Sequence, residues 1–578
     1  MAEQRLIVVG GGLAGLMATI KIAEAGVGVD LFSVVPVKRS HSVCAQGGIN
    51  AAVNLKGEGD SPTIHFDDTV YGGDFLANQT PVRNMCDKAP EIIYLLDRMG
   101  VPFSRTPEGN LDFRRFGGTK HHRTAFAGAT TGQQLLYALD EQVRRYEAEG
   151  LVRKFENWEF LSAVVNEAGI CTGITALDLL SMQIEVFEAP SVLLATGGPG
   201  IVYGRSTNSM VNTGTAAAAA YQQGATYANG EFIQVHPTAI PGQDKLRLIS
   251  ESVRGEGGRM WTVRDGKPWY FLEEWYPAYG NLVPRDIASR AIHKVVFEHG
   301  IKIDDQNCVY LDVTHLDPDM LTRKLGGVLE IYEKFMGVDP RFTPMKVFPA
   351  VHYSMGGLWV DSEQKTDIPG LFAAGECEYQ YHGANRLGAN SLLSCIYGGM
   401  IVGPNMLARS AENAGEGGSA AADEKARMEN HFAKLSSMDG TENAYALWNE
   451  LGDWMTRNVT VERHNDRLKE TDDKLQELME RWQNIGMNDH GQRANQELSF
   501  TNQLWNMLEL ARVITLGALA RDESRGAHFK PDFPERDDEN FLKTTKATWT
   551  ADGPQLDYED VETEHIVPRP RVYNVDIR

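Results

Sequence analysis

Cysteine is scarce in this chain of 578 residues, which has only 6. Even the closest two, Cys377 and Cys395, are too far apart to form a C-x-x-C or C-x-x-C-H motif. Such motifs usually hold iron–sulfur clusters, structural zinc or c-type haem. We therefore expect no iron–sulfur cluster, haem or metal site in this chain, and we interpret the cysteines as free buried thiols.

Positive charge is also in short supply, because 56 Lys and Arg face 78 Asp and Glu, for a formal net charge of -22. Nucleic-acid-binding proteins usually gather basic residues on one face, and an anionic membrane surface would repel so acidic a chain. Neither is an expected direct partner. An anionic substrate would need a few well-placed cations inside this negative envelope.

Long apolar runs are missing as well. The nearest candidate, residues 6–20, is interrupted by glycines, and no uninterrupted run approaches the roughly 20 residues of a membrane-spanning helix. We therefore expect that the chain does not cross a bilayer. Residues 1–5 contain no basic region or cleavage site, so a cytoplasmic location is the default expectation.

What remains is the composition of an ordinary globular protein, with 42% hydrophobic and 23% charged residues. This excludes collagen-like and globally disordered chains. At about 150 residues per domain, the length allows roughly four domains.

The N-terminal residues have the pattern of strand, glycine turn, helix and strand. A buried strand over 5–9 runs into the turn 10–15 (GGGLAG), a helix over 16–25 and a second strand over 29–34. In a G-x-G-x-x-G turn the glycines permit a tight bend, close approach of pyrophosphate and helix–strand packing. The helix N-terminus then attracts the phosphates. The pattern predicts a bound dinucleotide.

Residues beyond the glycine turn indicate the type of dinucleotide. Ser33 stands at the end of the second strand, where an acid usually binds the ribose, and Asp30 lies at the start of that strand, which argues against simple NAD binding. Two later buried strands, 191–195 and 368–374, also end near glycine. A long cofactor that touches several strands suits FAD better. Glu376 is a second candidate for the ribose, and a solvated loop acid is the alternative.

A helical region is expected near the C-terminal end, after residues 413–422, which have the composition of a flexible linker. Apolar residues then recur at helical spacing, at Val461, Leu468, Leu475, Leu478, Trp482 and Ile485. Another amphipathic helix is expected over about 497–521. A coiled coil is the alternative, but the spacing lasts only about three to four heptads, so an intramolecular bundle is favoured.

One segment, residues 39–49 (RSHSVCAQGGI), resembles the part of succinate dehydrogenase and fumarate reductase flavoprotein subunits that carries a histidine covalently bonded to FAD. Other segments resemble the same family in the same order: 236–238 (HPT), 250–258 (SESVRGEGG), 284–286 (PRD), 352–357 (HYSMGG), 382–391 (HGANRLGANS), 524–528 (SRGAH) and 534–538 (PERDD). The likeness covers nearly the whole chain. Residues 120–128 (KHHRTAFAG) most resemble the forms whose membrane partner is a single dihaem cytochrome b subunit.

The resemblance implies an α/β fold: a Rossmann-like FAD-binding domain with an inserted α+β capping domain, a helical bundle domain and a small C-terminal domain. The expected boundaries are 1–229 and 350–412 for the FAD-binding domain, 230–349 for the capping domain, 423–525 for the helical domain and 526–578 for the C-terminal domain. The segments near 230 and 350 would act as hinges for closure over the substrate.

The resemblance also implies FAD attached covalently at His41, although a lone histidine near a glycine turn is more often structural. Together with the glycine turn, it places cofactor contacts at Gly10, Gly12, Ala14, Gly15, Ser33, Ser40, His41, Gln46, Gly47, Gly48, Thr196, Gly197, Glu376, Asn390, Ser391 and Leu392.

A small dicarboxylate needs cations and hydroxyls at both ends. The resemblance assigns this binding to His236, Ser250, His352 and Arg386, with Ser250 standing where the family commonly has Thr. The alternative for the two histidines is hydrogen bonding in the core.

The family's proton shuttle corresponds to Arg285, with Glu251 and Arg254 as a relay towards solvent. A guanidinium is a poor base, because its pKa lies above about 12, so burial and a second nearby cation must make its proton easier to release. The alternative for Arg285 is an ion pair with its neighbour Asp286.

The implied function is oxidation of succinate to fumarate by hydride transfer to FAD. Electrons would pass to an iron–sulfur subunit and through a membrane cytochrome b anchor to quinone, at the cytoplasmic face of the cell membrane. The alternatives are the same complex working as a fumarate reductase, against which Gln46 argues weakly, and a soluble enzyme like L-aspartate oxidase, which lacks the linking histidine. A noncatalytic nucleotide-binding subunit would not need His352, Arg285 and Arg386 together.

Overall fold

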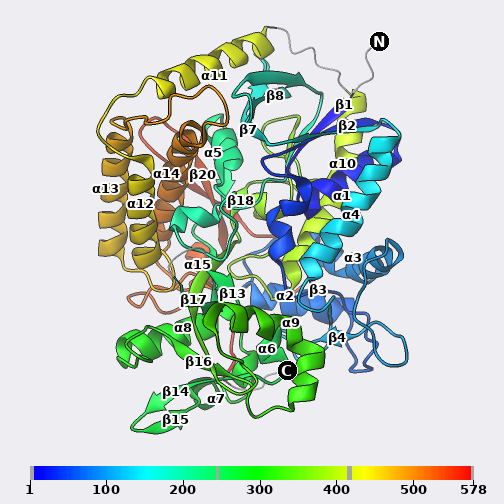
Figure 1. The fold of residues 1–578 in the computed structure, drawn as a ribbon, viewed down its shortest axis with the longest axis vertical. Helices are drawn as coiled ribbons and strands as arrows, with labels where there is room; N and C mark the ends of the chain where they lie inside the picture. Colours follow the sequence, from blue (N-terminus) through cyan, green and yellow to red (C-terminus); the bar gives the residue numbers. More distant parts are fainter. Residues whose placement is uncertain (1–4, 243–245, 413–418, 575–578) are drawn as a thin grey trace.

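A computed structural model describes residues 5–242, 246–412 and 419–574 (Figure 1). The expected linker at 413–422 lies mostly outside these residues. Helices and sheets are both present and form the α/β fold that was predicted. The expected domain boundaries stay predictions.

A parallel sheet forms the centre of the region that was predicted to bind FAD, here called the FAD-binding region, with strand order β19-β10-β1-β2-β6. Its strands are β1 (Arg5–Val9), β2 (Gly28–Ser33), β6 (Val152–Glu156), β10 (Val192–Leu194) and β19 (Leu371–Ala373). Because all five strands are parallel, their carboxyl ends meet at one edge. The glycine-ended strands predicted from the sequence therefore converge on one place.

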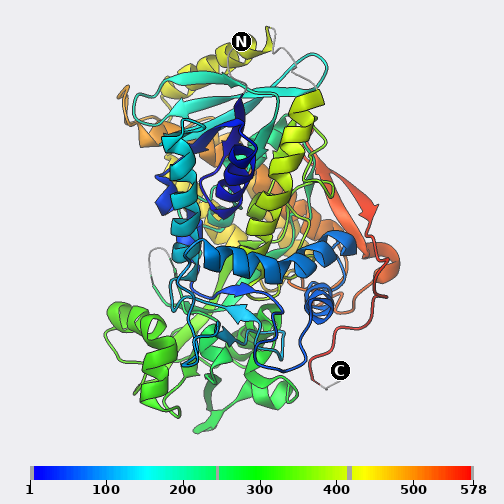
Figure 2. The ribbon, with the colours of Figure 1, turned by 90° about the vertical axis from the view of Figure 1, so that its right-hand side faces the viewer.

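Three helices cover this sheet: α1 (Leu13–Glu24), α4 (Thr131–Ala148) and α10 (Asn390–Glu412) (Figure 2). Helix α1 begins directly at the glycine turn. Helix α10 approaches α1 closely, because a Cβ added at Gly399 would lie 2.5 Å from the carbonyl oxygen of Ala14.

Helix α10 is long and apolar enough to span a membrane by length and composition alone, although its apolar run is interrupted. Its residues Asn390–Ala411 reach a mean hydropathy of 1.3, and 56% of the most apolar window is buried inside the protein. Scattered polar residues such as Ser394 interrupt the apolar run without making the helix polar on average. Length and hydropathy are weak evidence for a span, since buried core helices share them.

The inserted region is built on a sheet of order β13-β12-β17-β16-β14-β15. Its strands are β12 (Ile233–Ile240), β13 (Arg247–Leu248), β14 (Arg259–Arg264), β15 (Lys267–Trp269), β16 (Val309–Asp312) and β17 (Met345–Ser354). The chain enters on β12 and returns on β17, and these two strands pair antiparallel. Helices α8 (Arg285–His293) and α9 (Pro318–Met336) pack on this region, which forms the lower part of the molecule in Figure 1.

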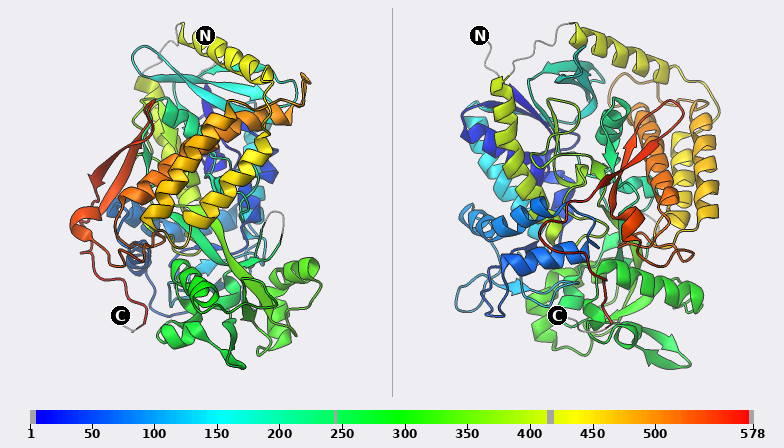
Figure 3. Two further views of the ribbon diagram at one scale, coloured as in Figure 1. Left: turned by 90° about the vertical axis from the view of Figure 1, so that its left-hand side faces the viewer. Right: turned by 180° about the vertical axis from the view of Figure 1, so that it is seen from behind.

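A bundle of three long helices lies on the other side of the molecule (Figure 3). These are α12 (Ala444–Asn458), α13 (Asn465–Trp482) and α14 (Gln496–Ala520). Most of the predicted apolar stripe is buried between them, including Leu468, Leu475 and Leu478, whereas Val461 lies before α13 and is only half-buried. The intramolecular bundle is thus confirmed over the coiled coil.

The C-terminal strands β20 (Lys543–Thr548) and β21 (Gln555–Asp560) do not form a sheet of their own. Strand β20 pairs with β11 (Tyr227–Ala228), which also pairs with β18 (Gly357–Leu358). The C-terminal region is therefore built onto the strands that flank the insertion.

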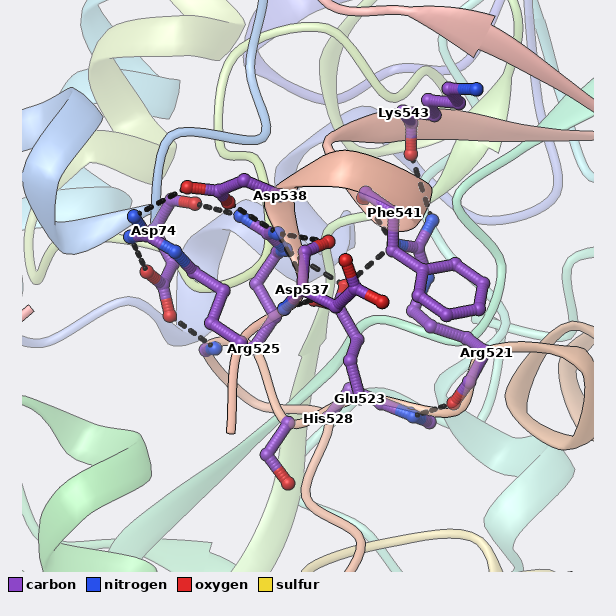
Figure 4. Close-up of polar contacts among 12 residues, drawn as sticks. Asp74, Arg521, Glu523, Arg525, His528, Asp537, Asp538, Phe541 and Lys543 are labelled. Atoms are coloured by element: carbon purple, nitrogen blue, oxygen red, sulfur yellow. Dashed lines mark hydrogen bonds and ion pairs between the residues drawn. The ribbon is translucent and has the colours of Figure 1, made fainter. Parts of the chain in front are cut away.

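A buried ionic network holds this region against the FAD-binding region (Figure 4). Arg525 donates hydrogen bonds to both carboxylate oxygens of Glu523, to Asp538 and to the carbonyl of Asp74. Arg521 shares Glu523 and also pairs with Glu231 at 2.8 Å. Buried charges are stable only when they are paired in this way.

Four of the six cysteines match their expected buried environment. Cys86, Cys171, Cys308 and Cys377 are buried free thiols, and Cys395 is half-buried. Cys44 is exposed, contrary to the expectation, because it ends a short 3-10 helix at the surface (His41–Cys44). Among the described residues, no cluster of His, Cys, Asp and Glu could hold a metal ion.

Candidate functional site

A groove of about 570 Å³ runs along the carboxyl ends of the parallel strands. Nine of the predicted cofactor residues line it: Gly10, Gly12, Ala14, Ser33, Ser40, His41, Thr196, Gly197 and Glu376. Its volume suits a dinucleotide better than a small metabolite.

The glycine turn has the close packing that a pyrophosphate site requires. A Cβ added at Gly10 would lie 2.1 Å from the carbonyl oxygen of Ala195, and one at Gly15 would lie 1.9 Å from the carbonyl oxygen of Gly10. Gly15 does not line the groove, so it serves helix–strand packing rather than direct contact. The N-terminus of α1 opens into the groove at Gly12 and Leu13.

The structure distinguishes among the candidate ribose-binding residues by their position relative to the groove. Asp30 faces away from the groove and pairs with Arg5 at 2.7 Å and with Arg153. Ser33 and Glu376 both line the groove. Glu376 is half-buried rather than fully solvated, and it accepts a hydrogen bond from the Ser354 amide at 3.0 Å. Burial raises its pKa to about 7.

A second cavity, of about 280 Å³, adjoins the groove, and His41 and Glu376 line both spaces. The Nδ1 atom of His41 accepts a hydrogen bond from the Ser209 amide at 3.2 Å. This cavity is also lined by the remaining predicted cofactor residues Gln46, Gly47, Gly48, Ser391 and Leu392. Asn390 lies behind the wall, where its side chain bonds Asn50, His65 and Thr69.

All of the residues assigned to the dicarboxylate, His236, Ser250, His352 and Arg386, line the second cavity. The rings of His236 and His352 lie 5.0 Å apart. Within the described residues, His236 Nε2 and Arg386 Nε are buried without a hydrogen-bond partner. Buried polar atoms are seldom left unsatisfied, so these two atoms are available to bond a polar ligand in the cavity.

The three residues assigned to proton transfer form a buried chain. Glu251 accepts from Arg285 Nε at 2.8 Å with one carboxylate oxygen and from Arg254 Nη2 at 2.7 Å with the other. Arg285 and Glu251 line the cavity, whereas Arg254 lies behind Glu251 and donates to the carbonyls of Asn281 and Val283. The alternative pairing of Arg285 with Asp286 is wrong, because Asp286 pairs with Arg290 and Arg571.

The cavity is positively charged. Burial and the charge of Arg285 hold the pKa values of His236 and His352 well below their usual range, so both imidazoles are neutral. Burial alone would raise the pKa of Glu251, but Arg285 and Arg254 together lower it. Burial and Arg285 also lower the pKa of Arg386 to about 9. The guanidinium groups of Arg285 and Arg386 therefore line this end of the cavity beside Glu251, and Arg254 lies behind that carboxylate.

Several residues that support the site were not found from the sequence. Gln234, fully buried on β12, accepts from Arg285 Nη1 at 2.8 Å and donates to the carbonyl of Arg386 at 2.7 Å. Thr207 lies 2.7 Å from His352 Nδ1. Arg114, fully buried, donates to the carbonyls of Gln46 and Gly47. The resemblance covered the HPT motif, but Gln234 lies two residues before it, and nothing in the sequence distinguishes a supporting glutamine there.

Comparisons with known proteins agree with this geometry. Residues 5–392 match the model for an FAD binding domain, and residues 448–573 match the model for the fumarate reductase flavoprotein C-terminal domain. The chain is 66% identical over 580 residues to the succinate dehydrogenase flavoprotein subunit of Bacillus subtilis, with 99% of each chain covered.

Two solved structures are similar over the whole length. A variant of E. coli quinol fumarate reductase FrdA superposes with a TM-score of 0.93 at 35% identity, and the match covers 99% of this chain and 100% of that one. Mycobacterium smegmatis Sdh1 in complex with UQ1 gives a TM-score of 0.84 at 30% identity, and covers 98% of this chain and 96% of that one.

Proposed function

This chain belongs to the family of succinate dehydrogenase and fumarate reductase flavoprotein subunits and is an FAD-binding oxidoreductase; within that family we propose that it oxidises succinate to fumarate in the cell. The proposal rests on one observation above all. A cavity with an excess of buried guanidinium charge opens onto the cofactor groove at His41.

The cofactor is FAD, and we propose that it is attached covalently at His41. The groove supplies the glycine turn, the helix N-terminus and Glu376 for the nucleotide half. His41 stands where the groove meets the second cavity, which is where the flavin ring must lie if it is to face a substrate there. Bound FAD supplies the hydride acceptor for the reaction.

The substrate cavity fits a small dianion. Arg386 offers a charged donor whose Nε atom has no partner among the described residues, and neutral His236 offers Nε2. Placing two carboxylates among Arg386, Arg285 and the two histidines neutralises charge that is otherwise buried. The same cations would polarise the carboxylate next to the reacting carbon and so stabilise negative charge that develops there.

We propose that Arg285 takes the proton from the carbon next to the one that loses hydride. Its Nε and Nη1 atoms are held by Glu251 and Gln234, which orients the guanidinium group. Glu251 bridges Arg285 to Arg254, so a proton has a hydrogen-bonded route away from the cavity.

The electrons must leave through other polypeptides. We propose an iron–sulfur subunit as the direct partner and a cytochrome b membrane anchor beyond it, with quinone as the final acceptor and the cytoplasmic face of the cell membrane as the location. Support comes from the 66% identical succinate dehydrogenase subunit and from the solved structure in complex with UQ1. Fumarate reduction uses the same site and is the alternative direction.

The first experiment is to denature the purified protein, separate it on a gel and look for flavin fluorescence that travels with the chain. His41→Ser should abolish this fluorescence while native protein still binds FAD. Fluorescence that persists in His41→Ser would place the attachment elsewhere. Fluorescence absent from wild-type protein that is yellow when native would favour an enzyme like L-aspartate oxidase.

The second experiment tests the chemistry. Arg285→Gln should keep flavin and dicarboxylate binding, measured by the flavin spectrum on titration with fumarate, but lose turnover with succinate. Substantial turnover in this variant would remove Arg285 from the proton step. Rates of succinate oxidation and fumarate reduction by the intact complex with its own quinone then decide the direction.

A further inference from the structure

The last described residues of the chain, 561–574, form a C-terminal segment without helix or strand. It runs from β21 across the FAD-binding region and ends beside the inserted region (Figure 3, right). From its contacts we infer that Arg571 is a positioning residue for Arg285. This inference rests on the proposed role of Arg285 in proton transfer.

The segment is fastened to the FAD-binding region along most of its length. The Gln79 side chain accepts from the amides of His565 and Ile566 and donates to the carbonyl of Ile566. The Tyr71 hydroxyl donates to the Val572 carbonyl at 2.9 Å and accepts from the Val572 amide at 2.6 Å. Residues on both sides of Arg571 are therefore held in place.

The network of Figure 4 adds a rigid support at the same place. Arg536 pairs with Asp74 and with Asp538, the carboxylates that lie beside Arg525. The same Arg536 guanidinium donates to the carbonyl of Arg569 at 2.9 Å. The backbone two residues before Arg571 is thus tied to a buried set of ion pairs.

Arg571 itself reaches across to the inserted region. Its guanidinium binds the Asp286 carboxylate with two hydrogen bonds, at 2.5 and 2.9 Å. The side chains of Arg571 and Asp286 are 6% and 1% exposed, so little water screens the pair. The ring of Tyr573 lies 5.0 Å from that of Tyr279 and adds an apolar contact to the same region.

Asp286 lies in the first turn of α8, directly after Arg285. Fixing Asp286 fixes the backbone from which the Arg285 side chain extends, while Glu251 and Gln234 hold its guanidinium end. The guanidinium of Arg285 is therefore held by the cavity wall, and its backbone is held, through Asp286, by the C-terminal segment.

Removal of Arg571 would also change the charge balance around Arg285. Among the described residues, the other cation on Asp286 is Arg290, at 3.3 Å. A buried carboxylate with one poor partner attracts any cation in reach, and the nearest by sequence is Arg285. Asp286 would then compete with Glu251 and Gln234 for that guanidinium.

The test compares Arg571→Gln with Arg569→Gln in the assembled, flavin-loaded enzyme. Arg569 is the matched control, because it lies in the same segment but pairs with Asp67 on the FAD-binding region. We expect Arg571→Gln to lower kcat for succinate oxidation about 10- to 100-fold, the range for a small misplacement of a reacting group. The KM for succinate should change less than about two-fold, and Arg569→Gln should match the wild type. Arg571→Lys should recover part of kcat.

A second variant keeps the test valid if Arg571→Gln does not fold. Asp286→Asn removes the carboxylate through which Arg571 acts, so it should lower kcat as well, and adding Arg571→Gln to it should change kcat by less than about two-fold. Normal kcat in Asp286→Asn would overturn the inference.

Two further results would overturn it. One is equal kcat in Arg571→Gln and Arg569→Gln. The other is loss of flavin or of thermal stability in both, with kcat per flavin unchanged, which shows a structural anchor only. A failure of the proposed function is distinguishable, because it appears as turnover in Arg285→Gln, whereas failure of this inference leaves Arg285→Gln inactive.

Discussion

Replacing Gln234 with leucine tests whether the hydrogen bonds around Arg285, and not charge alone, set its reactivity. Leucine has nearly the same volume but cannot accept from Arg285 or donate to the carbonyl of Arg386. A hydrogen bond to a charged group contributes about 1.5–3 kcal/mol. If the bond to Arg285 is fully expressed in the transition state, kcat/KM falls about 10- to 150-fold, since about 1.36 kcal/mol is a factor of ten.

The assay is succinate oxidation with an artificial electron acceptor, normalised to bound flavin. Gln223→Leu is the control, because Gln223 makes two hydrogen bonds to the backbone of Ala163 and lies away from both cavities. Its kcat/KM should stay at the wild-type value. Activity of Gln234→Leu within about two-fold of wild type, with flavin retained, would refute the reasoning that this glutamine orients Arg285.

Three more outcomes are expected. Because the pKa of Arg386 is lowered to about 9, this group loses its proton as pH rises through that value. The kcat/KM for succinate should therefore fall above about pH 9 in a pH profile of the free enzyme. A flat profile up to about pH 10 would contradict the role of Arg386 in binding. Gly15→Ala should destabilise the protein by about 1–3 kcal/mol or more and reduce flavin content, because the added Cβ would lie 1.9 Å from the Gly10 carbonyl oxygen. A Cβ added at Gly326 on α9 would meet no atom within 4 Å, so Gly326→Ala should be neutral or slightly stabilising in a denaturant titration. Burial raises the pKa of Glu58, but hydrogen bonds from His122 outweigh this and lower the pKa from 4.5 to about 2. This carboxylate therefore stabilises the fold above pH 4.5, and its contribution is lost as pH falls from 4.5 to 2. Glu58→Gln should weaken the dependence of the unfolding midpoint on pH in that window, and an unchanged slope would show that the pair of Glu58 and His122 adds no stability.

The FAD-binding unit was predictable because its signals are local. A buried strand, a glycine turn and a helix are encoded by residues that are neighbours in the chain, and Gly10 and Gly15 pack together in a way that any chain with this pattern would share. The helical bundle was predictable for the same reason, since Leu468, Leu475 and Leu478 recur at the helical period. The resemblance supplied the residues of the two cavities, and the structure gathers them, although their roles stay predictions.

The predictions that were wrong have other causes. Cys44 was expected to be buried because most free cysteines are. The alternative partner for Arg285 was Asp286, its neighbour in sequence, yet the structure pairs Arg285 with Glu251.

The sequence by itself determined the glycine turn, the order of the helices and strands around it, and which residue types were available for a dicarboxylate. Only the tertiary structure decided which of those residues meet. Gln234 reaches both Arg285 and Arg386, and Arg571 reaches Asp286 from the far end of the chain, because β12, α8 and the C-terminal segment pack together. Contacts between residues so distant in sequence arise from the packing of whole elements, which no local pattern of side chains encodes.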